Sequence, residues 1–117
     1  MNREEMKKRT KMFALQAIRL VDQLPRSTSG YVLGKQLMRS ATSVGANYRS
    51  ACRGRSKAEF IAKLGIVEEE ADESGFWMEL ISEAGLLKPE VVADLMREAN
   101  EITAIIVASL KTAKANK

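Results

Sequence analysis

The sequence predicts an all-α protein, an antiparallel up-down-up-down four-helix bundle that occupies residues 1–117 as one domain. Apolar residues recur at helical spacing through four long segments, short breaks containing Pro, Gly or Ser separate these segments, and no alternating β pattern occurs. With 117 residues, 45% hydrophobic and 29% charged, the chain is long enough to bury a core. Helices of roughly 22–28 residues at ~1.5 Å per residue would form a rod about 35–40 Å long.

The first helix is expected over residues 3–24. Asn2, followed three residues later by Glu5, resembles a capping box at its start. An apolar stripe then recurs at helical spacing through Phe13, Ala17, Leu20 and Leu24. The break over residues 24–30 contains Pro25, and Thr28 and Ser29 are possible caps for the next helix.

The second and third helices are expected over residues 30–53 and 57–84. Gly54 ends the second helix, and Ser56 with Glu59 forms a capping box that starts the third. Gly85 followed by Leu86 indicates a left-handed C-terminal cap with an apolar residue behind it.

The fourth helix is expected over residues 89–114. Pro89 suits its first turn, and Glu90 is favourable beside the positive end of the helix dipole. The apolar run over residues 102–110 is far shorter than the roughly 20 residues that span a bilayer, so we expect no membrane association.

Charge is divided unevenly along the chain, which has a net charge of +4. Residues 1–57 contain 13 Lys and Arg against 3 acidic residues, whereas residues 58–117 contain 6 against 12. Such a division favours two interpretations equally: a basic surface for a polyanion, or attraction between the two halves within or between subunits.

The basic residues of the second helix form a stripe opposite its apolar face. Projection at 100° per residue places Leu37, Ala41, Val44, Tyr48 and Cys52 on one side. The opposite side carries four cations that could follow a phosphate backbone without sequence preference. The predicted nucleic-acid contacts are therefore Lys35, Arg39, Arg49 and Arg53, with Lys7, Lys8 and Lys11 of the first helix as second choices. A solvated face or salt bridges to a neighbour would produce the same stripe.

The third helix is the acidic counterpart of this stripe. Glu70 and Glu73 could pair with Arg39 or Arg49, and Trp77 beside them is typical of a residue that anchors a core or an interface.

Small residues are frequent in the second helix, and four glycines fall inside predicted helices, namely Gly34, Gly45, Gly65 and Gly75. Each glycine costs about 1 kcal/mol relative to alanine, which suggests close backbone approach in the bundle or at a subunit interface.

Several enzyme classes are excluded by composition. With no His and one Cys, the chain cannot form the usual zinc sites, Glu-x-x-His di-iron sites, or Ser–His and Cys–His nucleophiles. We therefore predict no catalytic residues, no metal, no cofactor and no enzymatic activity. The lone Cys52 rules out an internal disulfide and fits a reducing cytoplasm.

The assembled motifs resemble one known family. They are Leu24-Pro25 before a Gly-containing turn, residues 37–49 (LMRSATSVGANYR), residues 60–64 (FIAKL), residues 70–74 (EADES) with Trp77, and residues 83–86 (EAGL). In order and spacing the chain resembles the 23S rRNA intervening-sequence (S23-like) proteins over about residues 8–112. Ser50 departs from the acidic residue expected after Arg49, which weakens a carried-over salt bridge there.

The resemblance implies a four-helix bundle that assembles as a homopentamer. The predicted interface or ion-pair residues are Asn47, Glu70, Glu73 and Trp77. The related accessory variability protein of diversity-generating retroelements works with a reverse transcriptase and RNA. The leading hypothesis is therefore an oligomer that binds RNA or DNA through its first two helices. The alternative is a protein-interaction or scaffold module whose basic and acidic faces pair between subunits.

Overall fold

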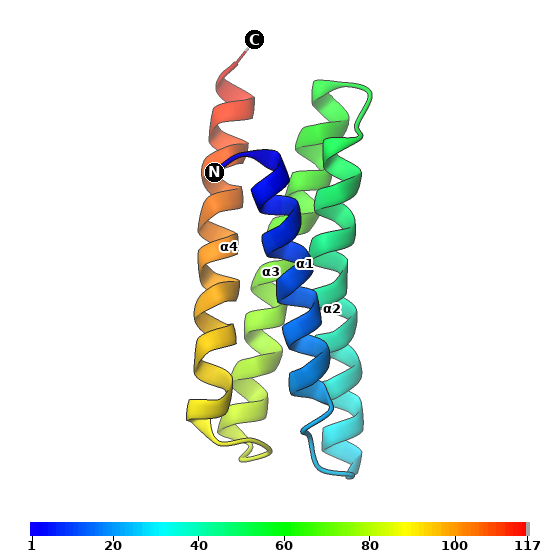
Figure 1. Cartoon of the computed structure of the whole chain (residues 1–117), viewed down its shortest axis with the longest axis vertical. Helices are drawn as coiled ribbons and strands as arrows, with labels where there is room; N and C mark the ends of the chain where they lie inside the picture. Colours follow the sequence, from blue (N-terminus) through cyan, green and yellow to red (C-terminus); the bar gives the residue numbers. More distant parts are fainter. Residues whose placement is uncertain (117) are drawn as a thin grey trace.

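Four α-helices make up the bundle in this computed structural model, which describes residues 1–116: α1 (Arg3–Val21), α2 (Thr28–Cys52), α3 (Lys57–Glu83) and α4 (Pro89–Ala115). No strand occurs within the described residues, and the predicted all-α class is confirmed. Successive helices run in opposite directions, so both ends of the chain lie at the same end of the bundle (Figure 1).

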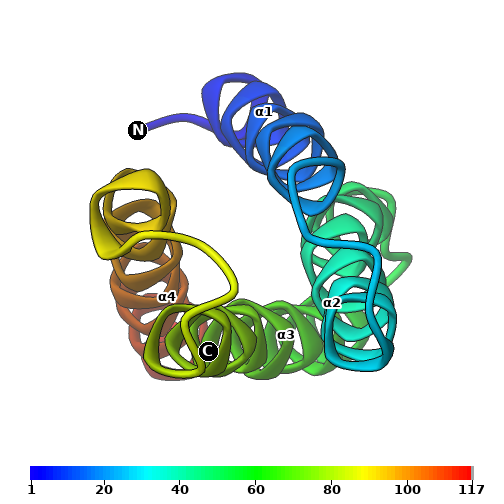
Figure 2. The ribbon, with the colours of Figure 1, turned by 90° about the horizontal axis from the view of Figure 1, so that it is seen from below.

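The helices follow one another around a ring (Figure 2). α2 packs against α1 and α3, and α3 against α4, whereas α1 and α4 contact each other least. Apolar side chains from all four helices meet in the centre, where the largest fully buried ones are Phe13, Leu37, Leu64, Met78, Ile81, Ile102 and Ile106. The core therefore depends on the apolar stripe of each helix, as the 3.6-residue periodicity predicts.

The bundle measures 49 × 20 × 19 Å. It is longer than the predicted rod of about 35–40 Å because its helices are staggered. The C-terminal end of α4 and the connection between α2 and α3 extend beyond the start of α1 (Figure 1). This stagger leaves one end of the bundle covered by only part of the helix ring.

Local sequence signals place most of the helix ends. The Glu5 N–H donates to Asn2 Oδ1 at 2.8 Å, and the Glu59 N–H donates to Ser56 Oγ at 3.1 Å, so both predicted N-caps are confirmed. Gly85 has a φ of 73°, the left-handed conformation predicted for the end of α3. The backbone N–H of Leu86 behind it donates to the Ile81 carbonyl at 3.0 Å, which closes the cap.

The first break differs from its prediction. α1 ends at Val21 rather than residue 24, and α2 begins at Thr28 rather than residue 30. The prediction of Thr28 and Ser29 as caps was wrong, because Ser27 is the N-cap and its Oγ accepts from the Gly30 N–H at 3.0 Å. Pro25 explains the early end of α1, since a proline disfavours helical geometry in the residue before it.

Within residues 1–116, none of the helices combines the length and the apolar character needed to cross a bilayer.

Candidate nucleic-acid interface

α1 and α2 lie close together where α2 carries its small residues. A Cβ at Gly45 would stand 3.3 Å from the Thr10 carbonyl oxygen, and one at Gly34 would stand 3.2 Å from Val21 Cγ1. In contrast, a Cβ at Gly65 or at Gly75 would meet nothing within 4 Å. Close helix approach therefore explains the two glycines of α2 but not the two of α3.

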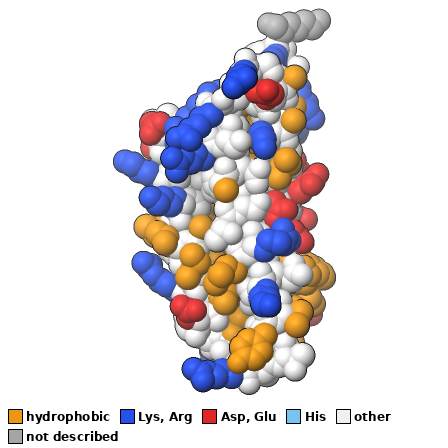
Figure 3. All heavy atoms as spheres, turned by 90° about the vertical axis from the view of Figure 1, so that its right-hand side faces the viewer, with side chains coloured by type: hydrophobic (Ala, Val, Ile, Leu, Met, Phe, Trp, Pro, Cys, Tyr) orange, Lys and Arg blue, Asp and Glu red, His pale blue; other side chains and the backbone are white. Residues whose placement is uncertain are grey.

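This close packing forms a shallow groove lined by basic side chains from both helices. We call it the basic groove. Its volume is about 440 Å³, and the five cations that line it are Lys7, Lys8, Lys11, Arg49 and Arg53. Figure 3 shows Lys and Arg side chains gathered over the upper part of the face on which α2 lies, with apolar side chains below them. The structure thus brings the three predicted lysines of α1 together with Arg49 and Arg53, two of the four cations predicted as nucleic-acid contacts in the second helix.

Most of the charge in the basic groove is unopposed. Lys7 pairs with Glu4 at 3.1 Å, and Glu4 is the one acidic residue in the described groove lining. Lys8, Lys11, Arg49 and Arg53 form no ion pair with any carboxylate of residues 1–116. All four are exposed, so they can reach a ligand without breaking an internal contact.

Arg39 lies on the same helix but is directed toward α3. Its Nη1 is 3.0 Å from Glu70 Oε2, and its Nη2 is 2.7 Å from Glu73 Oε2. The hydrogen bond to Glu73, together with the negative charges of both carboxylates, raises the pKa of the Arg39 guanidinium. Of the two predicted partners for these acids, the structure therefore selects Arg39 and leaves Arg49 free.

Lys35 lies outside the basic groove. It lines a separate hollow at the opposite end of α2, beside Tyr31 and the connection that contains Arg26. Fourteen residues separate it from Arg49, which corresponds to about 21 Å along a helix. The four cations predicted as one stripe are thus divided: Lys35 stands alone, Arg39 is paired, and Arg49 with Arg53 joins the α1 lysines.

Two further predicted residues are half-buried within the bundle. The Asn47 amide donates to the Ser43 carbonyl at 2.9 Å and to Ser43 Oγ at 2.8 Å, so its contacts stay within α2. Trp77 packs against the core, and its buried indole N–H has no hydrogen-bond partner within the described chain. Neither side chain carries a charge, so neither can take part in an ion pair, and a role at a subunit interface stays a prediction for both.

Arg9 forms ion pairs that the sequence analysis did not predict. Its Nε and Nη2 donate to the two carboxylate oxygens of Glu98 at 2.7 and 2.8 Å, and Nη2 also donates to Glu101 at 2.7 Å. These bonds join α1 to α4 across the weakest contact of the ring, and they raise the pKa of Arg9. No local signal distinguishes Arg9 from its basic neighbours, because its partners lie 89 and 92 residues away.

The cations of the basic groove are of the chemical types that can bind phosphate groups. Guanidinium and ammonium groups on an open groove donate hydrogen bonds to phosphate oxygens and attract them over longer distances. Among residues 1–116, no three His, Cys, Asp or Glu side chains converge as a metal site requires.

Comparisons with known proteins agree with this architecture. No curated protein sequence matches the chain. A crystal structure of a protein with unknown function from the S23 ribosomal protein family of Bacteroides thetaiotaomicron VPI-5482 is 32% identical, with a TM-score of 0.85. The similarity covers 91% of this chain and 98% of that one. The model of the family described as 23S rRNA-intervening sequence protein matches residues 3–108, and the chain belongs to that family.

Proposed function

We propose that this protein is a non-enzymatic, homo-oligomeric nucleic-acid-binding protein of the cytoplasm, which contacts RNA or DNA phosphates through the basic groove. The observation that carries the proposal is the convergence of five cations from α1 and α2 on one groove with a single acidic neighbour. Contacts of this kind bind the backbone of a strand without reading its sequence. The family resemblance adds the expectation of a pentamer, which would repeat the groove around a symmetry axis.

Binding measured across a salt series tests the proposal. A fluorescently labelled structured RNA and a DNA duplex are titrated with the protein, and affinity is followed by anisotropy from 50 to 300 mM KCl. Neutralising two groove residues in a Lys8→Gln, Arg49→Gln variant should flatten the slope of log affinity against log salt by about 2 for the duplex, since each phosphate contact contributes about 0.9.

A matched control separates the groove from general positive charge. Arg26→Gln with Lys35→Gln removes the same charge from the opposite end of the bundle, where both residues line another hollow. This variant should retain the wild-type slope within about 0.5. Equal slopes for the two double variants, or binding that does not respond to salt, would contradict the role of the groove.

A second function is favoured by the surface of α3. Ile66 and Phe76 are large apolar residues that remain exposed there, and the same helix carries most of the acidic residues. As an alternative we propose a protein-interaction or scaffold module, in which the acidic face of one subunit meets the basic face of the next or of another protein. Light scattering across a salt series distinguishes this function: high salt should dissociate the oligomer before any ligand binding is affected.

A further inference from the structure

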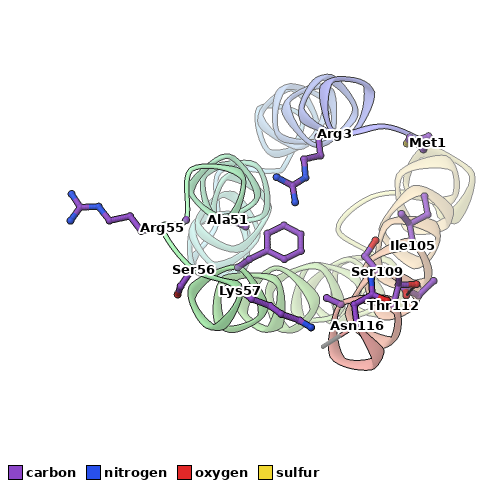
Figure 4. Close-up of a pocket in the computed structure, with 14 residues that line it drawn as sticks. Met1, Arg3, Ala51, Arg55, Ser56, Lys57, Ile105, Ser109, Thr112 and Asn116 are labelled. Atoms are coloured by element: carbon purple, nitrogen blue, oxygen red, sulfur yellow. Dashed lines mark hydrogen bonds between the residues drawn. The ribbon is translucent and has the colours of Figure 1, made fainter.

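A large cavity lies at the end of the bundle where α1 begins and α4 ends (Figure 4). Its volume is about 930 Å³, and all four helices contribute to its walls. The stagger of the helices creates it, because α4 and the α2–α3 connection continue beyond the start of α1 (Figure 1). A cavity of this size falls within the range of small-molecule sites. It is separate from the basic groove, since the two share no lining residue.

The charge of the cavity is entirely positive among its described lining residues. Arg3, Arg55 and Lys57 contribute cations, and no acidic side chain lines the cavity. In Figure 4 Arg3 points into the ring of helices and Lys57 extends across the start of α3 toward the end of α4, whereas Arg55 points away into solvent. Neither Arg3 nor Lys57 forms an ion pair within residues 1–116. Two unopposed cations that line one cavity favour an anion.

The first turn of α3 adds to this preference. Ser56 and Lys57 line the cavity where α3 begins, so the positive end of the helix dipole lies at its wall. The Ser56 hydroxyl is occupied by the Glu59 N–H, whereas the first backbone N–H groups of the helix have no partner within it. A phosphate group, with three acceptor oxygens, matches this set of donors better than a single halide or carboxylate would.

The remaining walls suit a flat, partly apolar body. The Arg3 guanidinium lies over the Phe60 ring, 4.5 Å from its centroid, and forms one wall. Ile105, Ser109 and Thr112 of α4 line the opposite side in Figure 4 and combine an apolar surface with hydroxyl groups. Stacked guanidinium and aromatic groups beside hydroxyls provide the contacts that nucleobases commonly receive in proteins.

We propose that this cavity binds a phosphorylated nucleoside, with its phosphate at Arg3 and Lys57 and its base between Phe60 and the α4 wall. The same chemical group occurs as a free mononucleotide and as the 5′-phosphorylated end of a strand. The inference does not rest on nucleic-acid binding by the basic groove, because it uses different residues.

Calorimetric titration with matched ligands tests both parts of the ligand. AMP should bind the full chain at least 10-fold more tightly than adenosine, which lacks the phosphate, and than ribose 5-phosphate, which lacks the base. A 5′-phosphorylated tetranucleotide, compared with its unphosphorylated form, identifies a strand end as the source if it alone binds. The absence of binding by both AMP and the phosphorylated tetranucleotide at 5 mM, or equal affinity for AMP and adenosine, would overturn the proposal.

Variants of the three cations locate the site. Arg3→Gln and Lys57→Gln should each weaken AMP binding at least fivefold, whereas Arg55→Gln, the matched control, should remain within twofold of the wild type. All three residues are exposed, so the fold is expected to persist and is checked by circular dichroism. The same loss for Arg55→Gln would show that only general charge matters. The Lys8→Gln, Arg49→Gln variant should still bind AMP normally, so this test and that of the basic groove can fail independently.

Discussion

The three hydrogen bonds of Arg9 predict how the ring of helices is closed. The guanidinium binds Glu98 through two bonds and Glu101 through one, and the Arg9 and Glu98 side chains are only 24% and 23% exposed. Charge-assisted hydrogen bonds contribute about 1.5–3 kcal/mol when shielded, whereas exposed ion pairs contribute roughly 0–1 kcal/mol. At a quarter exposure, Arg9→Gln should lower the free energy of unfolding by about 1–2 kcal/mol. For a chain of this length, the melting temperature should fall by about 4–8 °C.

Urea unfolding followed by circular dichroism at a fixed protein concentration measures this loss, since oligomerisation makes apparent stability depend on concentration. Arg97→Gln is the matched control, because Arg97 pairs only with Asp94 on the exposed face of the same helix. It should change stability by less than about 0.5 kcal/mol. A double-mutant cycle with Glu98→Gln should give a coupling of about 1 kcal/mol. A coupling near zero would refute the role of Arg9 in joining α1 to α4.

Three further predictions concern single sites elsewhere in the bundle. Ser56→Ala removes the N-cap of α3 and should lower the unfolding free energy by about 1 kcal/mol in the same urea assay, whereas no change would show that Ser56 does not stabilise the helix. Gly65→Ala should raise it by about 0.5–1 kcal/mol, because a Cβ there meets no atom within 4 Å, and a loss would reveal a contact outside the isolated chain. Burial raises the pKa of Tyr48 to about 12 from the usual 10.0. The unfolded chain therefore releases this proton first, and stability should fall between about pH 10 and 12. Tyr48→Phe should reduce this fall when unfolding is followed across that pH range, and an unchanged pH dependence would refute the assignment.

The local signals of the sequence were sufficient for most of the fold. Asn2 and Ser56 each accept a hydrogen bond from a backbone N–H three residues later, so both partners of each cap lie close together in the sequence. The end of α3 depends on Gly85 alone, because glycine adopts the left-handed φ without strain. The prediction of the first break was less accurate, because Ser27, Thr28 and Ser29 are all acceptable N-caps by residue type. Their choice depends on where α2 must begin to pack against α1, which neighbouring residues do not specify.

The candidate site depended on information that helical projection lacks. Projection correctly separates Arg39 and Arg49 from the buried face of α2, but it treats α2 as an isolated cylinder. The structure adds α3 beside Arg39 and α1 beside Arg49, so that one arginine meets two carboxylates and the other meets three lysines. The end cavity was missed for a similar reason, because it depends on the relative stagger of four helices rather than on any one of them.

The uneven charge of the chain therefore fits both interpretations that the sequence left open. Arg9 and Arg39 of the basic half bind four carboxylates of the acidic half, whereas Lys8 and Arg49 remain unopposed. Equal changes in net charge should consequently have different effects at different positions. Neutralising Arg9 should lower stability and leave the cations of the basic groove in place, and neutralising Lys8 or Arg49 should lower the proposed salt-dependent binding while stability is retained. It is the position of each cation relative to its neighbouring helix, rather than the net charge, that determines which property is lost.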